Sequence, residues 1–118
     1  MKRKGIALDP MDAGAYAAVA DALSVRGQYS EAIRNYERAL ALYPASTVAL
    51  FSHAEACLAD HRYDEAIRAL QRILALSPAE SARAYGVLAR VYQAQNLPEL
   101  AAEVKRKASA GVTVQLFR

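Results

Sequence analysis

Three residues that can ligate a metal ion stand four positions apart in the sequence: His53, Cys57 and His61. Residues at this spacing share one face of an α-helix, so the pattern can bring two imidazoles and one thiol toward a single cation. The alternative is that these side chains serve packing, because histidine and cysteine are both found in protein interiors. The spacing alone leaves both readings open.

Few other parts of the chain resemble an active site. The sequence contains no glycine-rich phosphate loop and no C-x-x-C pair, and Cys57, as the single cysteine, excludes an internal disulfide. Six of the seven tyrosines fall on positions that the helical pattern assigns to packing: Tyr16, Tyr29, Tyr36, Tyr63, Tyr85 and Tyr92. We therefore expect no enzyme activity.

The elements that position these residues follow a repeat of 34 residues. Pro10, Pro44 and Pro78 each close a similar phrase, namely IALDP, LALYP and LALSP. Shifting segment 29–44 by 34 positions places it on segment 63–78, with ten identical residues in sixteen. A fixed period of this length is typical of stacked helical repeats, which usually bind partners and rarely catalyse reactions.

Within each period, apolar residues recur at the spacing of amphipathic helices. The pattern predicts helices over 12–26, 30–43 and 46–60, with Ser30 and Asp64 as caps of the second helix in each pair. In the third period the pattern shifts by one residue over 85–92 and returns to the original phase from 97 onward. This shift predicts a longer connector after Pro78 and a turn at 95–96 that is one residue shorter. Alanine is abundant and strand-forming residues are sparse, which predicts an all-α fold.

The repeated residues resemble the tetratricopeptide repeat family, whose pattern is large-x-x-L-G-x-x-Y, then A-x-x-x-F, then P. The first period supplies Tyr16, Val19, Ala20, Leu23, Ala32, Tyr36 and Pro44, and the second supplies Leu50, His53, Ala54, Cys57, Ala66, Leu70 and Pro78. The resemblance implies a right-handed α-α superhelix of about three helix-turn-helix repeats. It also implies that positions 53 and 57 are core positions and that position 61 lies in a turn. On this basis we favour core packing, and we expect no metal ion and no cofactor.

The resemblance divides the chain into repeats at 12–44, 45–78 and 79–110. Residues 1–11 are expected to be the end of a preceding, incomplete repeat, and residues 111–118 a C-terminal tail. Gly111 is expected to end the last helix, with Lys105, Arg106 and Lys107 in its final turn. The alternating tail GVTVQLFR either folds over the last helix pair or docks on another copy of the chain.

The family lines a concave groove with its first helices, and the resemblance places nine residues of this chain there: Asp21, Val25, Val48, Phe51, Glu55, Leu58, Arg83, Arg90 and Gln93. The groove is expected to be apolar at Phe51 and Leu58 and charged toward its ends. Such a groove suits an amphipathic helix or an extended peptide with an apolar anchor. The alternative is that Phe51 packs on a neighbouring helix.

The leading hypothesis is therefore a non-enzymatic scaffold that binds another protein. Two alternatives stay open: self-association through the incomplete first repeat and the tail, and a repeat region that selects substrates for a larger enzyme. The net charge of +3 comes from basic residues near both ends, which we interpret as solvated surface rather than a nucleic-acid site. No apolar run is long enough for a membrane span, and the first residues do not resemble a signal peptide, so we expect a cytoplasmic protein.

Overall fold

The computed structural model describes the backbone of residues 12–116 and the side chains of residues 12–110. Within that range every regular element is helical, and no strand is present. In chain order the elements are α1 (Ala13–Val25), α2 (Tyr29–Leu42), α3 (Thr47–Ala59), α4 (Tyr63–Leu76), the short 3-10 helix η1 (Pro78–Glu80), α5 (Ser81–Ala94) and α6 (Pro98–Leu116). The prediction of an all-α fold is confirmed.

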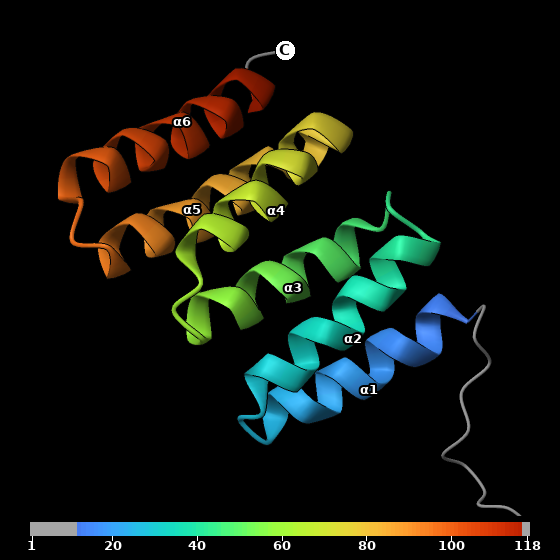
Figure 1. The fold of residues 1–118 in the computed structure, drawn as a ribbon. Helices are drawn as coiled ribbons and strands as arrows, with labels where there is room; N and C mark the ends of the chain where they lie inside the picture. Colours follow the sequence, from blue (N-terminus) through green and yellow to red (C-terminus); the bar gives the residue numbers. More distant parts are fainter. Residues whose placement is uncertain (1–11, 117–118) are drawn as a thin grey trace, which may run out of the picture.

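Successive helices form antiparallel pairs, α1 with α2, α3 with α4 and α5 with α6, and the three pairs stack in order (Figure 1). The first helices touch in sequence, since α3 contacts both α1 and α5. Between pairs, α2 also packs on α3, and α4 on α5. Among the described residues the first pair makes no contact with the third, as expected for a stack of helical repeats.

The first helices of the first two pairs begin at capping residues that are 34 positions apart. Asp12 accepts a hydrogen bond from the backbone N–H of Ala15 at 3.0 Å, and Ser46 accepts one from Ala49 at 3.2 Å. The predicted caps of the second helices are wrong, because α2 and α4 begin before Ser30 and Asp64 without a side-chain cap. Asp64 instead lies inside the first turn, where its charge still favours the helix dipole.

Each pair is closed by a turn of the same geometry. A residue with positive φ stands in each turn: Gly27 at 79°, His61 at 61° and Asn96 at 62°. The residue that follows donates its backbone N–H to a carbonyl five positions earlier: Gln28 to Leu23 at 2.9 Å, Arg62 to Cys57 at 2.8 Å and Leu97 to Tyr92 at 2.9 Å. This is the Schellman closure of a helix end, and it fixes how each second helix folds back.

Both length predictions for the third period are wrong. The connector after Pro78 is not longer, since α5 begins 34 residues after α3. Because all three turns use the same closure, the turn at 95–96 has lost no residue; instead α5 has 14 residues where α1 and α3 have 13. The second helix of the third pair keeps the shift, so its buried residues are Ala101 and Val104. Leu97 and Leu100, which match the original phase, are 39 % and 43 % exposed.

Small side chains lie where paired helices cross. Ala20 and Ala32 in the first pair, and Ala54 and Ala66 in the second, are all 0 % exposed. An alanine at these crossings lets the helix axes approach closely, and the larger buried side chains fill the space on either side. The repeated alanines therefore set the spacing of the stack.

The prediction that Gly111 ends the last helix is wrong. α6 continues through this residue to Leu116, so Lys105, Arg106 and Lys107 lie inside the helix rather than in its last turn. A glycine within a helix costs only about 1 kcal/mol relative to alanine, which a continuing helix can tolerate. The alternating run that follows is the pattern of a strand, yet its residues up to Leu116 continue the helix.

Two predictions lie outside the described residues, namely the incomplete repeat at 1–11 and the final two residues of the tail. Within the described part of the chain, no helix is both long enough and apolar enough to cross a membrane.

Candidate functional site

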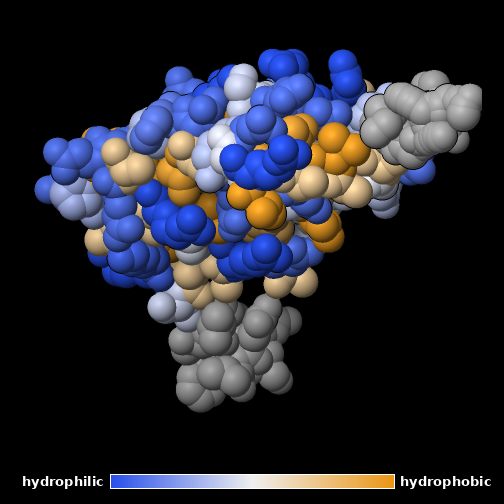
Figure 2. All heavy atoms as spheres, turned by 90° about the horizontal axis from the view of Figure 1, so that it is seen from below, coloured by the Kyte–Doolittle hydropathy of each residue, from blue (hydrophilic) through white to orange (hydrophobic). Residues whose placement is uncertain are grey.

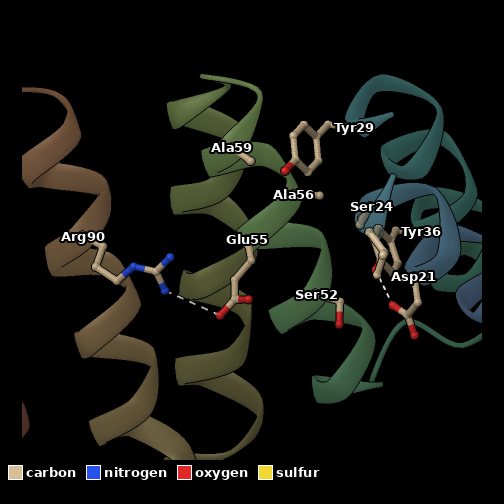
Figure 3. Close-up of a pocket in the computed structure, with 10 residues that line it drawn as sticks. Asp21, Ser24, Tyr29, Tyr36, Ser52, Glu55, Ala56, Ala59 and Arg90 are labelled. Carbon is tan, nitrogen blue, oxygen red and sulfur yellow. Dashed lines mark hydrogen bonds and ion pairs between the residues drawn. The ribbon is translucent and has the colours of Figure 1, made fainter. Parts of the chain in front are cut away.

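A pocket of about 430 Å³ opens between the first helices of the three pairs. Its walls come from α1, α3 and α5, with two tyrosines contributed by α2 (Figure 3). The lining residues are Asp21, Ser24, Val25, Tyr29, Tyr36, Ser52, Glu55, Ala56, Ala59 and Arg90. The pocket thus draws on all three pairs, which only the stacked arrangement brings together.

The structure brings together four of the nine residues that the family resemblance placed in a groove: Asp21, Val25, Glu55 and Arg90. The other five lie outside the lining of this pocket: Val48, Phe51, Leu58, Arg83 and Gln93. Of these, Val48 is 76 % exposed and Leu58 is half-buried against the core.

The expectation of an exposed aromatic anchor at Phe51 is wrong. Its side chain is only 2 % exposed, and the guanidinium carbon of Arg83 lies 4.0 Å from the centre of its ring. A cation over an aromatic face is an attractive contact, so Arg83 on α5 covers the ring from the neighbouring pair. The alternative reading, in which Phe51 packs on a neighbouring helix, is the one that the structure supports.

Tyr36 was predicted to be a packing residue, yet it also takes part in the pocket. Its ring is 2 % exposed, while its hydroxyl donates a short hydrogen bond to Oδ1 of Asp21 (Figure 3). Burial, and after it the hydrogen bond to the Asp21 carboxylate, raise the pKa of Tyr36 to about 12. The hydroxyl therefore stays protonated and holds Asp21 in place across the α1–α2 pair.

The opposite wall carries an ion pair. Nη1 of Arg90 on α5 lies 3.7 Å from Oε2 of Glu55 on α3, and both side chains are about half exposed (Figure 3). Glu55 thus partly neutralises the one cation in the lining, which leaves Asp21 as the uncompensated charge. Ser52 and Tyr29 add hydroxyl groups to the lining, whereas the hydroxyl oxygen of Ser24 is buried.

This lining offers hydrogen-bonding groups and charges of both signs. It contains carboxylates, hydroxyls and one guanidinium, and it contains no thiol and no imidazole. Sequence reasoning missed the two tyrosines because the family groove was assigned from first-helix positions alone. It missed Ser52, which does lie on a first helix, because position 52 is not one of those that the resemblance placed in the groove. The signal that identifies Tyr29 and Tyr36 is their place on the inner side of α2, which only the helix pairing reveals.

The metal-ligand pattern in the sequence is only partly reproduced. His61 has positive φ in the turn, its Nδ1 lies 2.9 Å from the hydroxyl oxygen of Tyr63, and it does not belong to the group of close ligand atoms that contains His53 and Cys57. His53 and Cys57 do lie together, and Glu65 of α4 joins them. Glu65 was missed because it comes from a different helix, at a spacing that no single-helix pattern includes.

The family model for the tetratricopeptide repeat matches residues 25–91 and 58–108. No curated protein matches the sequence. Tetratricopeptide repeats generally act as protein–protein interaction modules and are typically not enzymes.

Two solved structures of MamA show the same fold. One superposes with a TM-score of 0.83 at 23 % identity, covering 94 % of this chain and 64 % of that one. The other has a TM-score of 0.82 at 25 % identity, covering 88 % of this chain and 56 % of that one. The present chain therefore spans less than two thirds of either MamA chain. With a family model covering most of its length, the chain belongs to the tetratricopeptide repeat family.

Proposed function

We propose that this chain is a non-enzymatic interaction module that holds an extended, basic segment of a partner protein in the pocket between α1, α3 and α5. The observation that carries the proposal is the lining of that pocket, where the Asp21 carboxylate has no cation beside it and the hydroxyl-bearing residues Ser52 and Tyr29 line the same space. Such groups accept a lysine or arginine side chain and bond to the backbone of an extended peptide.

The pocket favours an extended peptide over an amphipathic helix. A helix in a groove relies on apolar anchors, and the aromatic side chain expected to receive one, Phe51, is covered by Arg83. The face drawn in Figure 2 is mostly hydrophilic, with apolar side chains in small clusters between charged ones. Most residues that line the pocket are polar or charged, so polar contacts are the main ones that it offers a peptide.

The proposal is tested with two pools of fluorescent decapeptides, identical except that the central residue is lysine in one and glutamate in the other. We expect the lysine pool to bind more tightly in fluorescence anisotropy. Asp21→Asn should weaken that binding by about tenfold, corresponding to about 1.4 kcal/mol. The asparagine keeps an acceptor for Tyr36, so the variant removes the charge with little change in shape.

The matched control is Asp64→Asn, which removes the same charge from an exposed position on α4, outside the pocket. It should bind the lysine pool like the wild type. Equal binding of the two pools, or equal losses in the two variants, would show that Asp21 does not recognise a basic side chain.

A further inference from the structure

We propose that His53, Cys57 and Glu65 form a binding site for a zinc-type divalent cation within the central helix pair. Their ligand atoms, one from each side chain, all lie within 4.8 Å of one another. The site is separate from the peptide pocket, whose lining includes none of the three. It reverses the sequence-based expectation that His53 and Cys57 serve only as core.

The donor set and spacing suit zinc. Imidazole nitrogen, thiolate sulfur and carboxylate oxygen are its usual ligands, at bond lengths of about 2.0–2.3 Å. Around a tetrahedral ion such bonds hold ligand atoms roughly 3.3–3.8 Å apart, and Cys57 Sγ already lies 3.7 Å from Glu65 Oε1. His53 and Cys57 are one helical turn apart on α3, and Glu65 faces them from the antiparallel α4. Small side-chain movements therefore complete the arrangement.

An unsatisfied histidine points to a missing ligand. Both ring nitrogens of His53 are buried, and neither has a hydrogen-bond partner among the described residues. Leaving a buried polar atom unpaired costs about 1–3 kcal/mol. Burial also lowers the pKa of His53, which keeps the imidazole neutral, the form that binds a metal. A cation bonded to one nitrogen relieves this cost.

The buried thiol of Cys57 is unsuited to act as a nucleophile. Its side chain is 0 % exposed, and burial, reinforced by Glu65, raises its pKa to about 12. The protein alone therefore holds a protonated thiol rather than a nucleophilic thiolate. Metal binding breaks the S–H bond, releases that proton to solvent and forms a sulfur–metal bond, as in other thiolate sites.

The proposed cation site adjoins a cavity, and the charges around it are compatible with a divalent ion. A cavity of about 350 Å³ adjoins His53 and Glu65 and is also lined by Glu37, Arg68, Ala69 and Arg72, so water can supply a fourth ligand. Arg62 lies 3.8 Å from Glu65 but 2.8 Å from Asp60, so it keeps its shorter ion pair when Glu65 turns to the metal. The Cys57 thiolate and the Glu65 carboxylate together balance the charge of a divalent ion. Of the two arginines that line the cavity, Arg68 and Arg72, the charge of Glu37 offsets one.

The probe is Co²⁺, added to the full chain without a histidine tag. We expect one equivalent to bind, with a thiolate charge-transfer band in the near ultraviolet and visible bands of tetrahedral cobalt, both removed by Zn²⁺. Cys57→Ser, His53→Gln and Glu65→Gln should each weaken binding by at least about tenfold, and Cys57→Ser should also abolish the charge-transfer band.

Two matched controls guard against other sites. His61→Gln alters the only other histidine, and Asp64→Asn removes a charge next to Glu65; both should bind Co²⁺ like the wild type. Circular dichroism confirms that each variant is folded, and Glu65→Gln, at a half-buried position, is the variant least able to disturb the core. The proposal is overturned if no thiolate band appears, if Glu65→Gln binds unchanged, or if His61→Gln loses binding as strongly as His53→Gln.

Discussion

At the scale of single residues, Tyr36 links the core to the proposed binding surface. A tyrosine at this repeat position fills the core with its ring, and the remaining hydroxyl must find a partner. Asp21 supplies that partner from the preceding helix, and it thereby becomes fixed at the rim of the pocket. The hydrogen bond from Tyr36 to Asp21 therefore connects a core residue with a residue of the proposed binding surface.

Tyr36→Phe should lower the free energy of unfolding by about 1 kcal/mol at pH 8, since it removes this hydrogen bond. The pKa of Tyr36 is raised from 10.0 to about 12 on folding. A raised pKa means that the stabilisation is complete below pH 10 and is lost as the pH rises from 10 toward 12. Urea unfolding at pH 8, 10 and 11 should therefore show a steeper loss of stability for the wild type than for the variant. Parallel losses in the two proteins would exclude Tyr36 as the titrating group.

Residue identity in the sequence does not reveal what will cover a side chain. Phe51 has the type and position of an exposed anchor, but Arg83, 32 residues later, lies over its ring. The carboxylate of Glu65 likewise joins His53 and Cys57 only through helix pairing. The family resemblance placed Asp21, Val25, Glu55 and Arg90 together in advance, and all four line the pocket.

At the scale of elements, the helix pairs could be predicted where the sequence carries a clear local pattern. The period and the prolines predicted the helix pairs, and the turns follow from backbone closure. The phase of the second helix of the third pair was predicted wrongly. Leu97 and Leu100 are apolar residues at positions of the original phase, but the buried residues of this helix are Ala101 and Val104. The last helix was predicted to be too short because a glycine followed by alternating residues is also the pattern expected at the end of a helix.

The turn geometry leads to a paired test at two glycines. Gly27 has φ of 79°, and an added Cβ would meet no atom within 4 Å, so Gly27→Ala tests backbone conformation alone. It should lower the free energy of unfolding by about 1 kcal/mol. Gly86, inside α5 and equally unobstructed, has no such φ, so Gly86→Ala should raise it by about 0.5–1 kcal/mol. Both are measured by urea unfolding, and a change of the same sign in the two variants would contradict this account of the turns.

At the scale of the whole molecule, the stack makes a surface that no single helix pair contains. The first and third pairs do not touch within the described residues, yet both contribute to the pocket, because the central pair holds them at a fixed spacing. The proposed cation site lies within that same central pair. The proposed peptide pocket is lined mainly by the first helices, with Tyr29 and Tyr36 added by α2.

The most direct test of the proposed function is to map peptide binding by NMR. Adding the lysine-centred decapeptide pool to ¹⁵N-labelled protein should shift the backbone amide signals around Asp21, Ser24, Ser52 and Glu55, with progressive change to saturation. Signals from the exposed faces of α2 and α4 should stay in place. If the largest shifts instead fall on α4 and on the exposed face of α2, away from Tyr29 and Tyr36, or if none appears at saturating peptide, the pocket between α1, α3 and α5 is not the binding site.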